Sequence, residues 1–301
     1  MTTAHKSRVL DMTRGDPFRL VLQFSLPLFC SNMLQQVYNL TDTALAGHLL
    51  GSAALAEIGA TAALYGLIMN FAFGMNNGLA LTVSRCFGAG EREGIRRAVG
   101  WMVTLSAAVS IVLTTVSLLG RGALLQVLQV PAEVWDGAAA YLTVILLGIP
   151  LTMLYNMEAA LLRAVGNSVT PLLFLLFSSV LNVGLDAAFM GPLGMGVRGA
   201  AVATVLAQGI SAVLGAVYLV RSYPELHFAP ARLKKSARRA VMNMFWAGMS
   251  MGLMSAIYNL GSVALQSSIN ALGSVYITAQ TAARRMAEMY FIPGGALGIG
   301  V

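Results

Sequence analysis

Charged residues are scarce in this chain. Only 10% of its 301 residues are Asp, Glu, Lys or Arg, whereas 57% are hydrophobic and the mean hydropathy is +0.74. A typical soluble domain has about one quarter charged residues. The scarcity of charge therefore excludes an ordinary soluble fold and indicates a polytopic membrane protein.

Cysteine is also rare, with two residues in the whole chain. Cys30 and Cys86 lack the spacing of a metal or disulfide motif, so we interpret both as reduced packing residues. The residues before position 20 lack the apolar core and cleavage site of a signal peptide. We therefore expect the first helix to remain in the mature protein.

Long apolar runs take up most of the sequence. A helix needs about 20 residues to cross about 30 Å of hydrocarbon, and these runs lack the alternation that is typical of a transmembrane β-barrel. The sequence therefore predicts an all-α membrane protein. The predicted spans are Leu20–Leu50, Ala53–Ser84, Ala98–Leu119, Ala138–Leu162, Pro171–Met190, Val197–Val220 and Val241–Asn270, and an eighth begins near Leu272.

Basic residues gather on one side of these spans. Cytoplasmic loops carry an excess of Lys and Arg, so the N-terminus is predicted to be cytoplasmic. The same asymmetry accounts for the net charge of +7 without a nucleic-acid partner. Of the nineteen Lys and Arg, fifteen lie on this side: Lys6, Arg8, Arg14, Arg19, Arg85, Arg92, Arg96, Arg97, Arg163, Arg221, Arg232, Lys234, Lys235, Arg238 and Arg239.

An internal repeat divides the chain. Tyr38-Asn39-Leu40 recurs as Tyr258-Asn259-Leu260, and six predicted helices separate the copies, as in transporters with parallel repeats. We therefore predict a six-helix N-terminal lobe at residues 1–220, a basic cytoplasmic linker at 221–240 and the first two helices of a second lobe at 241–301. Two complete copies would need about 440 residues, so we expect a longer whole protein.

Carboxylates interrupt two of the apolar runs. Asp42 lies about 34 Å along the first span, and Asp186 lies about 22 Å along the fifth. Asn182 shares a helix face with Asp186, and Thr204 and Tyr141 are expected at similar depth. These residues predict a polar layer in the outer half of the membrane.

An ionised Asp at the membrane centre costs about 2.5–3.5 kcal/mol on insertion scales, which indicates a polar cavity and a function. Two neighbouring carboxyls can take up and release a proton, and their oxygens also suit a hard cation such as Na⁺. The alternative is structural: each acid would form hydrogen bonds between helices or lie near the outer interface.

Several stretches of this sequence resemble the multidrug and toxic compound extrusion (MATE) family, in its bacterial DinF-like branch. The resemblance covers nearly the whole chain. It implies a twelve-helix antiporter of the bacterial cytoplasmic membrane, not an enzyme, which exports cationic or amphipathic compounds against H⁺ or Na⁺ and needs no other cofactor. The stretches are LPL (26–28), QVYNLTDTALAGHLLGSAALAEIG (36–59), LLRAVGNSVTP (161–171), LNVGLDAAF (181–189) and GPLGMGVRGAAVATVLAQGISA (191–212).

The resemblance also implies a cation site in the N-terminal lobe. The two acids of that site correspond to Asp42 and Asp186. Its asparagine, threonine and tyrosine correspond to Asn182, Thr204 and Tyr141. These five residues are the predicted ligands of a proton or of Na⁺.

The sequence departs from other branches of the family in its seventh helix. No acid is present there, and Ser262 takes the position that corresponds to Asp42 in the repeat. Glu158 does not fit the family pattern, and we expect a structural pairing or a cytoplasmic cavity contact. Arg284 and Glu288 have the i, i+4 spacing of an ion pair, and the role of Arg285 stays open.

The expected mechanism involves the first helix. Cation binding at the aspartates would change its packing, which Pro27 and Gly47 allow to bend. A compound would then leave a cavity lined by Gln35, Tyr38 and Asn39, and rocking of the lobes would reload it. We expect the complete protein to be monomeric and to contact only the lipid bilayer and its small-molecule substrates.

Two rival classes make different demands on the sequence. A lipid-linked glycan flippase of the same superfamily needs a cavity rich in Arg for pyrophosphate, and the first lobe has almost no Arg at that depth. An intramembrane aspartyl protease shares a proton between two Asp. Its Gly-x-Gly-Asp pattern is not matched by Gly184-Leu185-Asp186, and the repeat would have no explanation.

Overall fold

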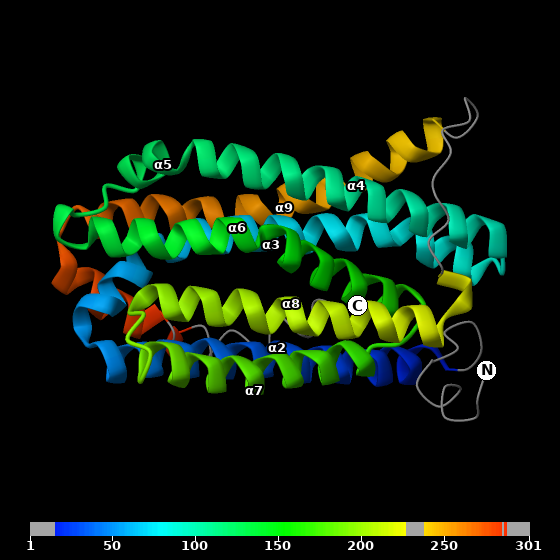
Figure 1. Ribbon diagram of the computed structural model, residues 1–301. Coiled ribbons are helices and arrows are strands. Elements are labelled where there is room, and N and C mark those ends of the chain that lie inside the picture. Colours follow the sequence, from blue (N-terminus) through cyan, green and yellow to red (C-terminus); the bar gives the residue numbers. More distant parts are fainter. Residues whose placement is uncertain (1–15, 227–237, 285, 288–301) are drawn as a thin grey trace.

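The chain folds into an elongated helical bundle (Figure 1). The computed structural model describes residues 16–226, 238–284 and 286–287, and these residues contain no β-strand, which confirms the all-α prediction. Residues 274–284 are helical. The other elements are α2 (Pro17–Leu50), α3 (Ser52–Gly88), α4 (Arg92–Leu119), α5 (Arg121–Val127), η1 (Ala132–Val134), α6 (Trp135–Ala164), α7 (Val169–Met190), α8 (Val197–Ser222), η2 (Pro224–Leu226) and α9 (Arg238–Asn270).

Six of the described helices are long and apolar enough to cross a membrane. They are α3, α4, α6 together with η1, α7, α8 and α9, and they contain the second to seventh predicted spans. The first predicted span is also a helix, α2, but it is not one of the six. Although α2 has 34 residues, its polar side chains Gln35, Gln36, Asn39 and Asp42 lower its hydropathy.

The eighth predicted span begins in the helical residues 274–284. Its remainder, from 288 onward, lies outside the described residues, as does Arg285. The predicted ion pair of Arg284 with Glu288 therefore also falls outside them.

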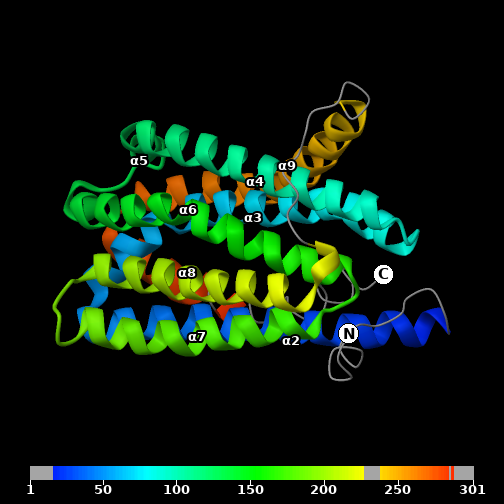
Figure 2. The ribbon, with the colours of Figure 1, turned by 45° about the vertical axis from the view of Figure 1, so that its right-hand side comes forward.

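Two groups of helices make up the bundle (Figures 1 and 2). One group contains α2, α7 and α8, in which α7 packs against both neighbours, and the other contains α3, α4, α6 and α9. The packing of α8 against α6 joins the groups. Because α7 lies between α2 and α8, side chains from these three helices can meet.

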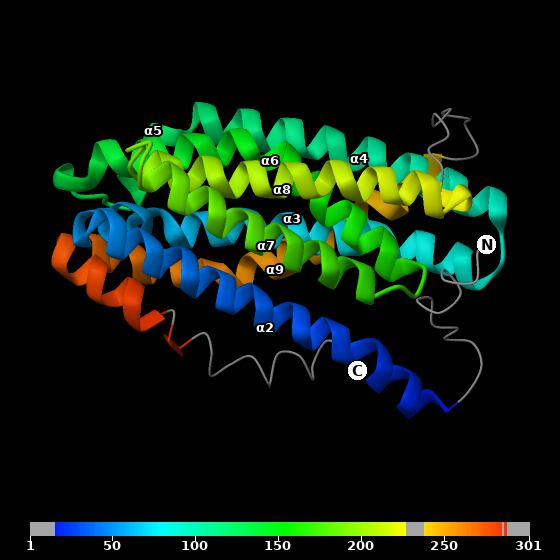
Figure 3. The ribbon, with the colours of Figure 1, turned by 60° about the horizontal axis from the view of Figure 1, so that its bottom comes forward.

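We name the two ends of the bundle after Gly51 and Gly90, which lie in the connections between helices at these ends. The Gly51 end contains Gly51 and residues 120–131 and 191–196, at the left of Figure 1. The Gly90 end contains residues 89–91, 165–168 and 223, at the right. Toward the Gly90 end, α2 extends away from the other helices (Figure 3).

A single residue, Gly51, connects α2 with α3. Its φ of +85° lies in the left-handed region, which a residue with a Cβ rarely adopts. The backbone N–H of Gly51 donates to the carbonyl of Gly47 at 3.1 Å. Gly51 therefore allows α2 and α3 to run in opposite directions without a longer loop.

Helix α9 packs tightly along α3 through small residues. A Cβ at Gly78 would lie 2.5 Å from the backbone oxygen of Ala247 and 2.7 Å from the Cα of Gly248. In lipid, where apolar surface gives little driving force, helices associate through such close packing. The glycines therefore set the distance between α3 and α9.

Asn270 holds the other end of α9. Its side-chain amide donates to the carbonyl of Ala60 at 3.1 Å and to that of Leu128 at 2.7 Å. Gln266 donates to the Asn270 oxygen at 2.9 Å. Because Asn270 is buried, these bonds fix the end of α9 to both α3 and the residue after α5.

We predict that Gly78→Ala destabilises the protein by about 1–3 kcal/mol, because the added methyl overpacks backbone that cannot move freely. Gly261→Ala on α9 is the matched control, since no atom lies within 4 Å of its added Cβ. Thermal unfolding of both purified variants in detergent measures the difference. Equal unfolding midpoints would show that α3 and α9 do not approach this closely.

Candidate functional site

Asp42 and Asp186 meet where α2 packs against α7. Their carboxyl groups lie close enough to interact electrostatically and, when one of them is protonated, to share a hydrogen bond. Asp186 is completely buried, and Asp42 is half-buried. Since an ionised carboxylate only accepts hydrogen bonds, a bond between the two groups requires one proton.

Asn182 connects Asp186 to α8. With its amide nitrogen turned toward Asp186, it donates to Oδ2 at 2.8 Å, and its oxygen accepts from the backbone N–H of Thr204 at 3.1 Å. The amide also lies 3.4 Å from the Thr204 hydroxyl. Both Asn182 and Thr204 are buried. The structure thus brings the predicted asparagine and threonine to the predicted acid.

Tyr38 completes this group from α2, one helical turn before Asp42. Its hydroxyl lies 3.4 Å from Thr204 Oγ1, and it is within electrostatic range of Asp42, Asp186 and Tyr65. The sequence predicts Tyr38 only in the substrate cavity and does not indicate Tyr65. The i, i+4 spacing of Tyr38 and Asp42 could have predicted that Tyr38 lies beside the aspartates.

Tyr141, the fifth predicted ligand, lies on α6 in a neighbouring apolar cluster. Only 6% of Tyr141 is exposed, and the same cluster contains Ala46, Ile145 and Ala201. The cluster also includes residues at the start of α8 and is bordered by Tyr65. Tyr141 is therefore at the same end of the bundle as the aspartates.

The predicted cavity residues continue along α2. Gln35 donates to the side-chain oxygen of Asn39 at 3.4 Å, and Asn39 donates to that of Gln36 at 3.5 Å. All three are half-buried. With Tyr38, they give this stretch of α2 a polar side composed mainly of amides.

The two predicted bend positions lie within one continuous helix. Pro27 stands inside α2, and its carbonyl accepts a hydrogen bond from the Ser31 hydroxyl at 2.8 Å. A Cβ at Gly47 would lie 3.0 Å from Leu55 Cδ1 of α3. Pro27 removes one backbone donor from the helix, whereas Gly47 brings α2 close to α3.

The site is rich in oxygen and draws on three helices. Asp42 and Tyr38 come from α2, Asp186 and Asn182 from α7, and Thr204 from α8. Carboxylates, hydroxyls and an amide oxygen are suitable for a proton or for a hard cation such as Na⁺. The residues present therefore fit the predicted coupling ion.

Comparison with known proteins identifies the family. The sequence model of the MatE family matches residues 27–188, which is more than half of the chain. The chain belongs to the MatE family. This assignment confirms the resemblance at the level of the family, and the matched region includes Asp42, Asn182 and Asp186.

Individual relatives agree with the MatE assignment. The chain is 28% identical to the probable multidrug resistance protein YpnP of Bacillus subtilis over 294 residues, which are 98% of this chain and 65% of YpnP. It is 26% identical to YoeA, another probable multidrug resistance protein of B. subtilis, over 94% of this chain and 63% of YoeA. The chain therefore spans less than two thirds of these relatives.

A solved structure shows the same fold. The MATE multidrug transporter DinF-BH, in complex with a small molecule, superimposes with a TM-score of 0.82 at 24% sequence identity. The match covers 92% of this chain and 62% of DinF-BH. The helical bundle of this MatE protein is thus a MATE fold.

We predict that Asn182→Ala lowers the free energy of unfolding by about 1–3 kcal/mol, because it leaves a buried carboxyl oxygen without its donor. Asn70→Ala is the control: Asn70 is exposed and bonds only to the carbonyl of Gly66 in its own helix, at 2.8 Å. A surface change of this kind stays within about 0.5 kcal/mol. Thermal unfolding in detergent compares them, and equal losses would contradict the bridging role of Asn182.

Proposed function

We propose that the complete MatE protein is a cation-coupled antiporter that exports cationic or amphipathic compounds. One observation carries the proposal: Asp42 and Asp186, from two different helices, meet in a buried group of oxygens within a bundle of membrane-spanning length. The names of YpnP and YoeA and the small-molecule complex of the multidrug transporter DinF-BH support a multidrug substrate range.

The coupling step follows from electrostatics. A proton or Na⁺ at the pair offsets the charge of Asp42 and Asp186, and its departure leaves two negative charges close together. Their repulsion is strong where water is excluded. Because Asp42 is on α2 and Asp186 is on α7, the repulsion acts between these helices and alters how α2 packs.

The substrate step uses the polar side of α2. The ring of Tyr38 attracts a cationic or aromatic compound through its face, and the amides of Gln35 and Asn39 adapt to different hydrogen-bonding groups. Tyr38 also contacts the ion site through Thr204. Ion binding and substrate binding thus both depend on the position of the Tyr38 side chain, so that binding of one opposes binding of the other. Antiport requires such competition.

The expected orientation assigns the Gly90 end to the cytoplasm. Arg92, Arg96 and Arg97 lie at this end, in agreement with the excess of basic residues in cytoplasmic loops. In a bacterial cytoplasmic membrane, each charge that moves inward with the ion provides about 2.3 kcal/mol per 100 mV of potential. The complete protein is expected to act as a monomer.

We predict that Asp42→Asn and Asp186→Asn each abolish gradient-driven ethidium efflux, because an amide cannot exchange a proton or offer a negative charge to Na⁺. The control is Asp136→Asn, at an exposed aspartate at the start of α6, which should retain efflux. The assay uses the complete gene product in proteoliposomes under an imposed pH gradient and then a Na⁺ gradient. The effective gradient identifies the ion.

Other results of the same assay would overturn the proposal. Efflux by both aspartate variants at the wild-type rate would make the acids structural. If the wild type exports no ethidium under either gradient, multidrug antiport is wrong, and transport of a lipid-linked glycan becomes the next activity to assay.

The orientation gives a separate prediction. A green fluorescent protein inserted at residues 89–91 should fluoresce, and alkaline phosphatase inserted at residues 191–196 should be active, because the two connections lie at opposite ends of the bundle. Exchanging the two reporters should abolish both signals. The reverse pattern would place the Gly90 end outside.

A further inference from the structure

Asp186 and Glu158 are the two buried charged side chains among the described residues. Glu158 is 4% exposed and lies on α6 near the Gly90 end, whereas Asp186 lies near the Gly51 end. Within the described part of the chain, Glu158 forms no ion pair and its Oε1 has no hydrogen-bond partner. Of the two expectations for Glu158, the structural pairing is therefore not found there, and the cavity contact remains.

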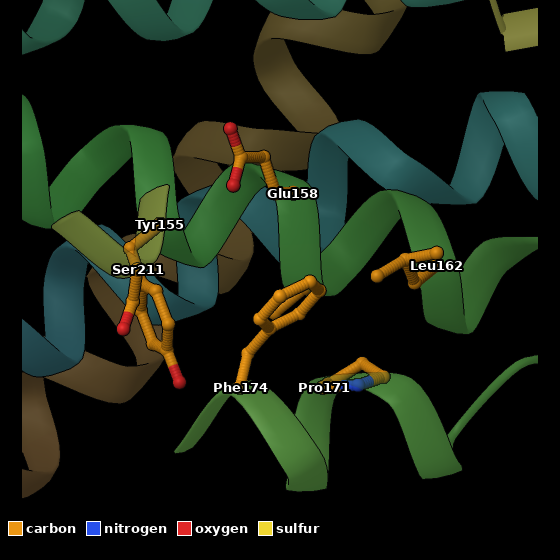
Figure 4. Close-up of a pocket in the computed structure, with 7 residues that line it drawn as sticks. Tyr155, Glu158, Leu162, Pro171, Phe174 and Ser211 are labelled. Atoms are coloured by element: carbon orange, nitrogen blue, oxygen red, sulfur yellow. The ribbon is translucent and has the colours of Figure 1, made fainter. Parts of the chain in front are cut away.

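Glycine makes room for the Glu158 carboxyl. A Cβ at Gly215 on α8 would overlap Glu158 Oε2, so the acid reaches the backbone of α8 because Gly215 has no side chain. A small pocket adjoins this contact between α6, α7 and α8 (Figure 4). Its lining includes Glu158, Phe174 and Ser211. The Glu158 carboxyl thus lies between α6 and α8, beside this pocket.

A line of small and polar residues on α8 leads from the aspartates to Glu158. Thr204, Gln208, Ser211 and Gly215 are spaced by four, three and four residues, which places them on one helix face. We call this line the α8 seam. It extends over about 16 Å from the first to the last residue at 1.5 Å per residue.

Each position of the α8 seam faces a polar group of another helix or is itself buried and polar. Thr204 contacts the Asn182 amide and the Tyr38 hydroxyl. Gln208 accepts a hydrogen bond from Thr152 of α6 at 2.5 Å. Ser211 is completely buried, and its hydroxyl has no partner among the described residues.

Polar groups continue from the pocket to the Gly90 end. Phe174, in the pocket wall, packs edge-on against Tyr218 with 5.8 Å between ring centroids. The Tyr218 hydroxyl lies 3.5 Å from Thr170 Oγ1. Asn167 donates to Thr170 Oγ1 and to the Tyr223 hydroxyl, each at 2.8 Å. This cluster reaches the connection between α6 and α7.

We infer that Glu158 is a further proton-binding carboxyl beyond the pair of Asp42 and Asp186, and that it exchanges protons with Asp186 along the α8 seam. In the transfer, an O–H bond at Asp186 breaks and an O–H bond at Glu158 forms. The hydroxyls of Thr204 and Ser211 each accept one proton and give up another, water molecules carry the proton across the gaps between them and past the Gln208 amide in the same way, and no electrons are exchanged. The inference rests on the proposed antiport and adds to it the route of the ion.

The chemistry of the α8 seam favours a proton over Na⁺. Its polar groups are spread at about one per helical turn, whereas a hard cation takes several oxygens at a single point. A proton needs only one acceptor at each step. The seam therefore matches proton transfer better than movement of a metal ion.

Among the described residues, Glu158 is the acid in the interior of the Gly90 half of the bundle, and the other charged residues there are basic or lie near helix ends. On α6, Arg163 donates to Asn77 at 3.1 Å and stacks over Phe73 of α3 at 5.5 Å. The only charged residue of α7 is Asp186. The remaining charges of the helices that pack on α6 lie near helix ends: Asp136 of α6 itself, Arg198 and Arg221 of α8, Glu57 and Arg85 of α3, Arg92, Glu93, Arg96 and Arg97 of α4, Arg121 of α5, which donates to Thr143 of α6, and Glu133 of η1.

Infrared difference spectra between alkaline and acidic pH test proton binding directly. The complete gene product in lipid should show a carboxylic C=O band that is lost in Glu158→Gln and kept in Glu57→Gln, the control at a half-buried acid outside the seam. An unchanged spectrum in Glu158→Gln would overturn the inference. If the band behaves as expected but the wild type exports nothing under a pH gradient, the antiport proposal fails and the proton site stands.

Efflux of ethidium from proteoliposomes tests the route. Under a pH gradient, Glu158→Gln should lose efflux while it keeps the wild-type Kd for ethidium. Ser211→Ala should slow efflux, and Ser110→Ala should not, since Ser110 is also buried but bonds only to the carbonyl of Ala107 on α4, at 3.0 Å. Equal rates in the two serine variants would show that protons do not use the α8 seam.

Discussion

The cost of burying a carboxyl group in a lipid-embedded bundle is the constraint on which this structure depends. Asp186 is completely buried, and it is tolerated because Asn182 donates to it and Asp42 can share a hydrogen bond with it when one of the two acids is protonated. These partners come from α7 and α2, and Thr204 supports them from α8. The position of α7 between α2 and α8 is therefore required by the site as well as by packing.

Glycines reduce the same cost of burial, because buried polar groups of different helices can meet only where the helices approach closely. Gly215 lets the Glu158 carboxyl reach α8, and Gly78 lets α9 lie against α3. In lipid, apolar side chains gain little by leaving their surroundings. Close backbone contact and buried hydrogen bonds, such as those of Asn270, thus have a larger share in holding this bundle together than in a soluble protein.

Composition was sufficient to predict the helices, because hydrocarbon accepts backbone only as helices or closed barrels. The acids of the site stood out because they interrupt apolar runs. The contact of Tyr38 with Thr204 was beyond prediction: it joins residues 166 positions apart and depends on how α2 and α8 are rotated. The choice between a pairing and a cavity contact for Glu158 stayed open for the same reason, since sequence does not show that α8 presents Gly215 to it.

The location of the α8 seam shows how the proposed antiporter would keep its ion route intact while it changes shape. Asp186, Thr204 and Glu158 lie on α7, α8 and α6, which all fall within the predicted first lobe. Lobes that rock as rigid bodies move relative to each other and leave contacts inside each lobe unchanged. The proposed proton route, built from one lobe, would therefore survive the movement that opens and closes the proposed substrate cavity. Asp42, on α2 of the same lobe, joins this route to the polar side of α2.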